Sequence, residues 1–338
     1  MVIPAAATRS SGGPVVVITG ASSGIGRATA VAFARQRCRL VLAARREAAL
    51  QETARLVERL GSETHVVVAD VSRPEDIERL VSETRNRWHR IDVWINNAGT
   101  TLFGRLEDGD FAAHRQVLDT NLLGPMYAAR LVMPVLKRQG RGIVINVGSV
   151  LSQVGQAFVP AYAISKFGLR GLSEALRSDV ADYPDIHICT VLAYAVSTPH
   201  FEEGANAMGR RPYAMPPVQT PEKVAAAIVD LVRRPRRQRY VPRYIPGGLA
   251  AHWLLPRSME RLLLHALERF HMVGTQAPTD GGLFAPLPGT GATHGTRTPR
   301  VGRLAFAAWA VADLMAIALG AAWQGRNAPH HVQHAEGR

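Results

Sequence analysis

A glycine-rich turn between a buried strand and a helix constrains the fold of this chain more than any other sequence feature. The apolar residues 15–18 (VVVI) are followed by TGASSGIG at residues 19–26, and a helical pattern then continues to about Arg37. Glycines let backbone N–H groups approach a bound pyrophosphate, which the positive end of the following helix also attracts. A strand, a glycine-rich turn and a helix start in this order predict a dinucleotide-binding site.

The rest of the first 243 residues alternates between apolar runs and helical patterns. Strands are predicted at residues 15–18, 39–44, 65–69, 91–95, 142–147, 186–192 and 239–241, with helices between them. The longest helical pattern, residues 110–137, is interrupted near Gly124-Pro125 because proline disturbs a helix interior. Strands that alternate with helices predict an α/β fold with a doubly wound parallel sheet, the Rossmann fold.

A tyrosine and a lysine stand at a spacing that suits proton transfer. Tyr162 and Lys166 are four residues apart and therefore share one face of a helix, and Ser149 precedes Tyr162 by thirteen residues. A nearby cation favours phenolate over phenol, so we expect Lys166 to lower the pKa of Tyr162. The pair alone is a weak signal, since a solvated helix face has the same pattern. Its place after the glycine-rich turn favours an acid/base function.

Four motifs in order resemble those of the short-chain dehydrogenase/reductase family, in its common single-domain form. The family pattern T-G-x-x-x-G-x-G matches at Thr19, Gly20, Gly24 and Gly26; NNAG stands at residues 96–99; Y-x-x-x-K matches at Tyr162 and Lys166 with Ser149 ahead of it. The resemblance covers residues 14–243. It implies an oxidoreductase that transfers a hydride between a nicotinamide cofactor and an alcohol or carbonyl substrate, in which Tyr162 is the general acid/base.

The resemblance also implies a role for each matching residue. Ser149 would bind the substrate oxygen, Lys166 would hold the nicotinamide ribose, and Asn121 would hold a backbone carbonyl and a water on a proton path to Lys166. The expected catalytic residues are Asn121, Ser149, Tyr162 and Lys166. The expected cofactor-binding residues are Gly20, Ser22, Ser23, Gly24, Ile25, Gly26, Arg45, Asp70, Val71, Asn97, Ala98, Gly99, Tyr162, Lys166, Val196 and Thr198.

Arg45 decides the expected choice of cofactor. It follows the second predicted strand, where family members that use NAD carry an acidic residue that accepts the ribose hydroxyls. A guanidinium at this position pairs well with the 2′-phosphate of NADP. The alternative is a solvated arginine pair, Arg45 and Arg46, at the start of a helix. We expect NADP(H) to be preferred over NAD(H).

One departure from the family pattern supports a rival interpretation. Where the family has Pro-Gly after the sixth strand, this chain has Ala193-Tyr194, so the geometry of the nicotinamide carboxamide site is in question. The rival is a non-catalytic scaffold or sensor that binds NADP(H). The intact Ser149, Tyr162 and Lys166 set favours an enzyme. The apolar residues of the loop at 200–217 favour an apolar, steroid-like or lipid-like substrate.

Charge and cysteine content narrow the classes of partner. The formal net charge is +13, which suits phosphate-bearing ligands, anionic membranes or nucleic acid, but no nucleic-acid-binding motif is present and no such partner is expected. Two cysteines, Cys38 and Cys189, are too few for a disulfide framework. The histidines of the tail lack further ligands at metal-binding spacing, so no metal is expected. The resemblance implies a homodimer or homotetramer.

The residues after 243 lie outside the family pattern. We expect a disordered tail at 1–13, the Rossmann-fold oxidoreductase domain at 14–243, an amphipathic helical extension at 244–273, a Gly/Pro-rich linker at 274–303, an apolar helix at 304–323 and a polar tail at 324–338. The apolar helix has three alternatives: it crosses a membrane, lies flat on an anionic membrane, or packs on the domain. Asp313 disfavours crossing. No secretory signal is recognised, so the expected location is cytoplasmic, with contact to a membrane through residues 304–323 left open.

Overall fold

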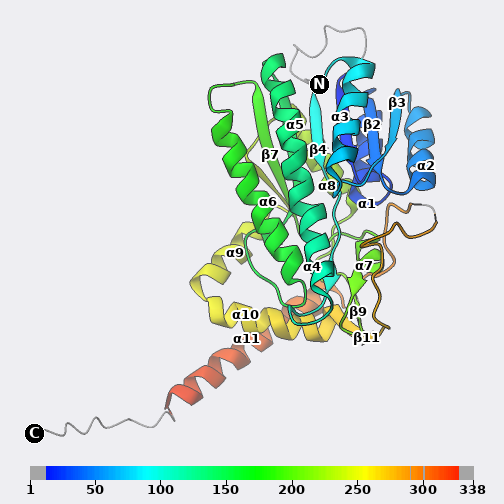
Figure 1. Cartoon of the computed structure of the whole chain (residues 1–338). Helices are drawn as coiled ribbons and strands as arrows, with labels where there is room; N and C mark the ends of the chain where they lie inside the picture. The colour runs from blue at the N-terminus through cyan, green and yellow to red at the C-terminus, as the bar shows by residue number, and fades with distance from the viewer. Residues whose placement is uncertain (1–12, 290, 300, 327–338) are drawn as a thin grey trace, which may run out of the picture.

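The structure is a computed structural model, and it describes residues 13–289, 291–299 and 301–326. The expected tail at 1–13 lies outside this range except for Gly13, and so do the last twelve residues of the expected polar tail. A seven-stranded parallel sheet forms the centre of the molecule, with strand order β10-β7-β6-β4-β1-β2-β3 (Figure 1). The strands are β1 (Val15–Thr19), β2 (Arg39–Ala44), β3 (Thr64–Val68), β4 (Val93–Asn96), β6 (Gly142–Ser149), β7 (Ile186–Ala193) and β10 (Gln238–Val241).

Helices cover both faces of the sheet, as the alternating pattern predicts. One face carries α1 (Gly24–Ala34), α2 (Glu47–Glu58) and α8 (Pro221–Arg233), and the other carries α3 (Pro74–Trp88), α5 (Gly124–Gln139) and α6 (Pro160–Asp179). The central strands are mostly apolar because both faces are buried; all five residues of β1 are buried. The expected doubly wound α/β fold is confirmed.

The chain reverses its direction across the sheet between β1 and β4. It runs outward from β1 through β2 to β3, and then returns to β4 on the other side of β1. In open α/β sheets, ligands bind outside the carboxyl ends of the strands at such a switch point. The glycine-rich turn after β1 and the NNAG segment after β4 therefore meet at one place.

The expected interruption of the long helix is a π-helical turn. Helix α4 (Phe111–Leu118) passes into a π turn at Asp119–Leu123, and α5 begins at Gly124. A Cβ on Gly124 would lie 2.5 Å from the carbonyl oxygen of Val71, so only glycine allows this close approach. Asn121 lies within the π turn and is fully buried.

The amphipathic helical extension expected at residues 244–273 is divided into two helices. It forms α9 (Ile245–Leu254) and α10 (Pro256–Ala266), followed by a π turn at Leu267–His271. Leu255 leaves the helical region (φ −133, ψ 59) because the ring of Pro256 disfavours helical geometry in the residue before it. Two short sheets complete the lower part of the molecule: β5 (Leu102–Phe103) with β8 (Ala205–Asn206), and β9 (Arg210–Pro212) with β11 (Met272–Thr275).

The described residues of the expected linker pack along the domain. In Figure 1 they form the brown segment that runs beside α7 (His200–Glu203) and close to α1. Thr279 exchanges two backbone hydrogen bonds with Asn206, and Gly282 donates to the carbonyl of Glu203 at 2.7 Å. Backbone groups that pair with the domain in this way are held in place, unlike those of a free linker.

The last described helix, α11 (Arg303–Arg326), contacts the rest of the molecule through its first half. Phe306 and Trp309 form an aromatic cluster with Phe270, and His265 pairs with Asp313 at 2.9 Å. Among the described residues, no helix is long and apolar enough to cross a bilayer.

Candidate active site

A cavity of about 390 Å³ lies at the carboxyl ends of the sheet strands. Nearly all of the expected site residues line it, namely Gly20, Ser22, Ser23, Gly24, Ile25, Arg45, Asp70, Val71, Asn97, Ala98, Gly99, Ser149, Tyr162, Lys166, Val196 and Thr198. Gly26 and Asn121 do not line it; both lie behind its wall. Motifs spread over about half of the chain therefore meet in one space, because the parallel strands deliver them to one edge of the sheet.

The glycine-rich turn is shaped as a cradle that side chains would fill. Gly20 has a left-handed backbone (φ +66), and a Cβ there would lie 2.8 Å from the Cα of Ala98. A Cβ on Gly26 would lie 2.1 Å from the carbonyl oxygen of Gly20. The first amides of α1 have no acceptor within the helix, and Ile25 lines the cavity. This arrangement fits a dinucleotide whose diphosphate lies at the start of the helix.

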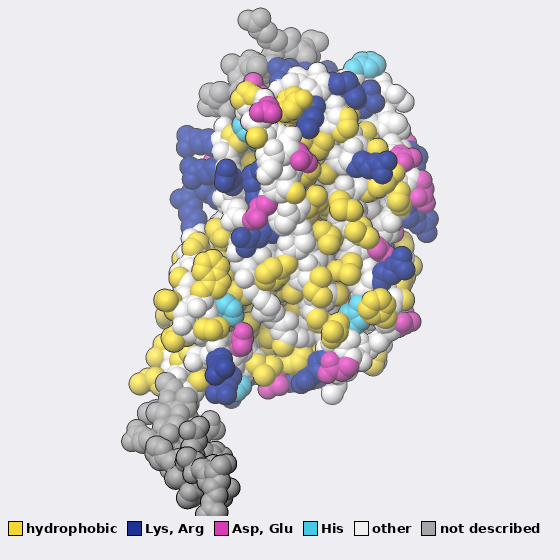
Figure 2. Space-filling view, turned by 60° about the vertical axis from the view of Figure 1, so that its left-hand side comes forward, with side chains coloured by type: hydrophobic (Ala, Val, Ile, Leu, Met, Phe, Trp, Pro, Cys, Tyr) yellow, Lys and Arg dark blue, Asp and Glu magenta, His cyan; other side chains and the backbone are white. Residues whose placement is uncertain are grey.

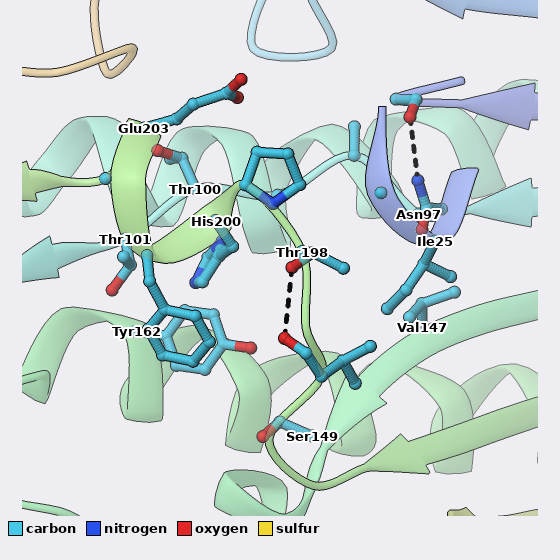
Figure 3. A pocket seen from close by; sticks show the side chains of 18 of the residues that line it. Ile25, Asn97, Thr100, Thr101, Val147, Ser149, Tyr162, Thr198, His200 and Glu203 are labelled. Carbon is cyan, nitrogen blue, oxygen red and sulfur yellow. Dashed lines mark hydrogen bonds between the residues drawn. The ribbon is translucent and has the colours of Figure 1, made fainter. Parts of the chain in front are cut away.

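Asn97, which directly follows β4, connects the glycine-rich turn to the end of that strand. Its side-chain amide donates to the carbonyls of Thr19 (2.9 Å) and Gly20 (3.2 Å), and Figure 3 marks one of these two bonds. The hydroxyl of Thr19 accepts from the amides of Asn97 (3.0 Å) and Ala98 (3.1 Å). The NNAG segment thus sets the shape of the glycine-rich turn in addition to lining the cavity.

Asn121 acts on the backbone beside the cavity. Its side-chain oxygen accepts from the amide of Thr100 at 2.8 Å, and its side-chain nitrogen donates to the carbonyl of Thr100 at 2.9 Å. The same nitrogen donates to the hydroxyl of Ser165 on α6 at 3.0 Å. The side chain therefore holds a backbone carbonyl, and it ties the segment after β4 to the helix that carries Tyr162.

Tyr162, Ser149 and Lys166 lie together at the centre of the cavity wall. Figure 3 shows Tyr162 above Ser149, with His200 next to the Tyr162 ring. Burial raises the pKa of Tyr162 to about 12, although hydrogen bonding with Ser149 lowers it. The phenol is therefore protonated at neutral pH and is a proton donor in this environment.

The effect of Lys166 on the pKa of Tyr162 differs from the one expected. Its Nζ donates to the carbonyl of Val147 at 3.0 Å and lies 5.4 Å from the centre of the Tyr162 ring. Burial lowers the pKa of Lys166 to about 8. Because burial of Tyr162 disfavours phenolate, its pKa is raised, and the expected lowering by Lys166 is not found.

Arg45 and Arg46 both face the cavity and both have protein partners. Arg45 donates to the carbonyls of Leu283 (3.1 Å) and Gly282 and lies 3.6 Å from a carboxylate oxygen of Asp70. Arg46 donates to Glu203 at 2.7 Å and to the hydroxyl of Ser23 at 3.0 Å. The carbonyl partners of Arg45 lie far along the sequence.

Aromatic residues beyond the four motifs line the other end of the cavity. His200 lies 5.6 Å from Tyr162 between ring centres, and His271 lies 5.8 Å from Phe103 and 6.0 Å from Phe201. Burial lowers the pKa of both histidines to about 4, and the charge of Lys166 contributes at His200. Both rings are neutral at physiological pH. His271 is in the C-terminal extension, which no family motif reaches, so the sequence carried no signal for it.

The Ala193-Tyr194 departure is accommodated without blocking the cavity. Ala193 ends β7, and the amide of Tyr194 donates to the carbonyl of Val241 at 2.9 Å. The phenol of Tyr194 points to the carbonyl of Pro216 at 3.4 Å, and burial raises its pKa to about 12. Tyr194 therefore forms part of the wall, and Val196 and Thr198 still line the cavity after it.

Comparison with known proteins decides the family. A family profile described as short chain dehydrogenase matches residues 14–208. The chain belongs to the short-chain dehydrogenase/reductase family. Members of this family act on alcohol and carbonyl groups with a nicotinamide dinucleotide cofactor, and this chain is an oxidoreductase of that kind.

Individual relatives extend beyond the matched range. The chain is 32% identical over 254 residues to YxnA, an uncharacterised oxidoreductase of Bacillus subtilis, with 74% of this chain and 71% of that protein covered. It is 31% identical over 316 residues to 11-beta-hydroxysteroid dehydrogenase 1A of Arabidopsis thaliana, covering 86% of each. An alcohol dehydrogenase from Thermococcus sibiricus, solved with 5-hydroxy-NADP, is similar with a TM-score of 0.59 and 28% identity, covering 67% of this chain and 94% of that one.

Proposed function

We propose that this short-chain dehydrogenase/reductase is an NADP(H)-dependent alcohol dehydrogenase or carbonyl reductase with Tyr162 as its general acid/base. The observation that carries the proposal is the shared cavity: Ser149, Tyr162 and Lys166 line the same space as the glycine-rich cradle. A cofactor held by the cradle and a substrate held by Ser149 would therefore meet at Tyr162. The nicotinamide, when bound, supplies the hydride for reduction or accepts it in oxidation.

Each residue of the set has a distinct task. The hydroxyl of Ser149 hydrogen-bonds the substrate oxygen, and the phenol of Tyr162 gives that oxygen a proton during reduction or removes one during oxidation. Lys166 hydrogen-bonds the ribose next to the nicotinamide from its position on α6. Asn121 keeps the Thr100 backbone and α6 in register, which its three hydrogen bonds support.

The preference for NADP(H) rests on the two arginines after β2. Arg45 and Arg46 both line the cavity, and no acidic residue ends β2. Asp70, the nearest carboxylate to Arg45, offsets part of its charge. Arg46, beside the Ser23 hydroxyl, adds a second guanidinium to this corner, and Glu203 offsets part of its charge.

The substrate is proposed to be apolar. Around Tyr162, the cavity is lined by Phe103, Leu151, Phe201, Met215 and Leu263. The similarity to a hydroxysteroid dehydrogenase over 86% of both chains agrees with a large apolar alcohol or ketone. Because these side chains offer few polar partners, burial of apolar surface would supply most of the substrate affinity.

The experiment that tests the function is a substrate screen. Purified protein is mixed with NADPH and a panel of ketones, aldehydes and quinones that includes steroids, and the absorbance of NADPH is followed. Consumption of NADPH that depends on the ketone supports the proposal. NADPH binding without turnover on any member of the panel would instead favour the rival, a non-catalytic NADP(H)-binding scaffold.

Two exposed apolar surfaces support the two proposed partners, a further copy of this chain and an anionic membrane. The first includes Leu123, Met126, Ile164 and Phe167 near or on α5 and α6, and supports a homodimer or homotetramer formed through these helices.

The second surface lies on α9, α10 and α11. Exposed Trp253, Leu254, Leu264, Val311 and Met315 form it. Figure 2 shows hydrophobic side chains gathered at the lower left of the molecule. It supports contact with the surface of an anionic membrane by a cytoplasmic protein, because the chain carries a net charge of +13.

A further inference from the structure

A segment far outside the matched family residues lies against both walls of the dinucleotide site. We call the described residues 279–289 and 291–297 the strap. On one wall, the amide of Gly24 in the glycine-rich turn donates to the carbonyl of Ala292 at 2.9 Å, and Arg27 of α1 donates to the carbonyl of Gly291. On the other wall, the amide of Gly295 donates to the carbonyl of Ser197 at 3.3 Å. The strap therefore bridges the β1–α1 turn and the segment after β7.

The fit of the strap against both walls depends on glycine. A Cβ on Gly291 would lie 1.7 Å from the carbonyl oxygen of Ser22, and a Cβ on Gly295 would lie 2.2 Å from that of Thr198. Real Cβ atoms do not come this close to a backbone oxygen. Alanine at either position must therefore displace the strap from that wall, which makes these glycines precise points for loosening it.

The strap also builds part of the cavity itself. Gly282, Pro286 and Leu287 line the same cavity as the glycine-rich turn. The carbonyls of Gly282 and Leu283 accept from the guanidinium of Arg45 and so fix its position beside the cavity. A bound dinucleotide would have the strap as one of its walls at the end where Arg45 stands.

The strap uses the amide of Gly24, and the amide of Ile25 remains available to bind an anion. Gly24 is the first residue of α1, and its amide donates to a carbonyl of the strap, that of Ala292. Ile25 follows it on the cavity wall, and α1 itself offers its amide no acceptor. A diphosphate at the helix start and the strap can thus be bound together, each with its own amide.

One carboxylate anchors the C-terminal end of the strap. An oxygen of Glu202 on α7 accepts from the hydroxyl of Thr296 at 2.9 Å, from the amide of Arg297 at 2.8 Å and from the amide of Thr296. Arg297 in turn donates to the carbonyl of Phe201 at 2.7 Å. Removing the Glu202 carboxylate would therefore release three hydrogen bonds of the strap in a single substitution.

We propose that the strap is part of the dinucleotide site and retains the bound cofactor by closing its outer side between Ser22–Gly24 and Ser197–Thr198. This inference rests on the proposed function, because it takes NADP(H) as the ligand of the cavity. Cofactor release requires the strap to leave at least one wall, so the strength of the strap contacts sets the dissociation rate.

The test measures the dissociation rate of NADPH by stopped-flow fluorescence, in wild type and in Glu202→Ala and Gly291→Ala variants of the full chain. We expect dissociation to be about tenfold faster or more, with a weaker Kd, because Glu202→Ala removes three hydrogen bonds of the strap and Gly291→Ala displaces it from the Ser22 carbonyl. Glu260→Ala removes an exposed carboxylate on α10, and Gly302→Ala adds a Cβ where no atom lies within 4 Å. These matched controls should release NADPH at the wild-type rate.

Four outcomes separate this proposal from its alternatives. Dissociation that is unchanged in both variants, with melting temperatures near that of wild type, overturns the retaining role. Tighter NADPH binding in both variants also overturns it, since the strap would then compete with the cofactor. If wild-type protein binds neither NADPH nor NADH, the proposed function fails first. Faster release in only the variants that loosen the strap supports the inference.

Discussion

The ammonium of Lys166 lies 5.4 Å from the centre of the Tyr162 ring and donates to the carbonyl of Val147 at 3.0 Å. The lysine is therefore tied to the end of β6, the strand that carries Ser149 as its last residue. Burial of the phenol raises the Tyr162 pKa to about 12, and the hydrogen bond with Ser149 offsets only part of this rise. In this environment Tyr162 is better suited to giving a proton than to taking one.

Replacing Tyr162 by phenylalanine tests the proton donor. The ring and its packing remain, but the titrating group is lost. We expect NADPH affinity to change little and kcat to fall by about a hundredfold or more, the range of general acid/base catalysis. Binding is measured by NADPH fluorescence and kcat by NADPH absorbance with the best ketone of the screen. Turnover at the wild-type level in this variant would contradict the assignment.

Lys166→Ala should reduce both kcat and cofactor affinity, because the lysine is proposed to hold the ribose and to lie beside Tyr162. Its pKa of about 8 adds a pH dependence. The charged form donates and attracts the cofactor, and it is lost as the pH rises through about 8. NADPH affinity of wild type should therefore weaken above this pH, and Lys166→Ala should lack this change. Titrations of NADPH fluorescence between pH 6.5 and 9.5 measure it; parallel curves for both proteins would argue against this role.

Arg45→Asp tests the choice of cofactor. The change removes a guanidinium from the cavity wall and places a second carboxylate near Asp70, so a 2′-phosphate is repelled. We expect kcat/KM for NADPH to fall much more than kcat/KM for NADH. Arg59→Asp makes the same charge change at an exposed site after α2 and should leave the ratio as in wild type. An unchanged ratio in Arg45→Asp would show that this residue does not read the phosphate.

The buried histidines should make the fold sensitive to acid. His271 has a folded-state pKa of about 4, well below its usual value of 6.5, so the unfolded chain binds more protons between these values. The free energy of unfolding therefore falls as the pH falls from 6.5 towards 4. Each such histidine contributes a slope of up to about 1.4 kcal/mol per pH unit.

His271→Asn should make this dependence shallower. Asparagine can still donate to the Tyr213 carbonyl, which His271 contacts through Nδ1. The control is His89→Asn, at an exposed residue with φ 58, a backbone that asparagine tolerates. Urea unfolding at pH 4.5 to 7 measures the slopes; equal slopes in wild type and His271→Asn would contradict the prediction.

The apolar surface of α9, α10 and α11 should bind anionic vesicles. In flotation with phosphatidylserine-containing vesicles, we expect the full chain to float with the lipid and a chain ending at Thr298 to float much less, because the shorter chain lacks α11. The binding should weaken in high salt, since arginines contribute to it. Equal recovery of both chains in the lipid fraction would show that α11 is not needed.

The dimer or tetramer through α5 and α6 is tested by light scattering after gel filtration. Phe167→Glu places a charge on this exposed apolar surface and should shift the protein to monomer. An unchanged mass would place the contact elsewhere.

Much of the fold and most of the cavity wall could be predicted from the sequence, because they depend on residues that are close together in the chain. The turn after β1 needs glycine at Gly20 and Gly26, because any Cβ would meet backbone within 3 Å. Tyr162 and Lys166 share a helix face by spacing alone. Once the strands are parallel and ordered, their carboxyl ends share an edge, so Asn97 and Ser149 had to lie near that turn. Pro256 likewise accounts for the division of the expected helical extension into α9 and α10.

Only the tertiary structure decided how these residues are surrounded. The pKa of Tyr162 depends on its burial, and burial is set by elements that are distant in sequence. His271 and the strap reach the cavity from beyond residue 270, through contacts such as Gly24 with Ala292, and a Gly/Pro-rich segment has no periodic pattern that reveals its partner. Neighbouring residues in the sequence determine the local backbone conformation. A contact between residues more than 200 positions apart depends instead on how the completed fold brings two surfaces together.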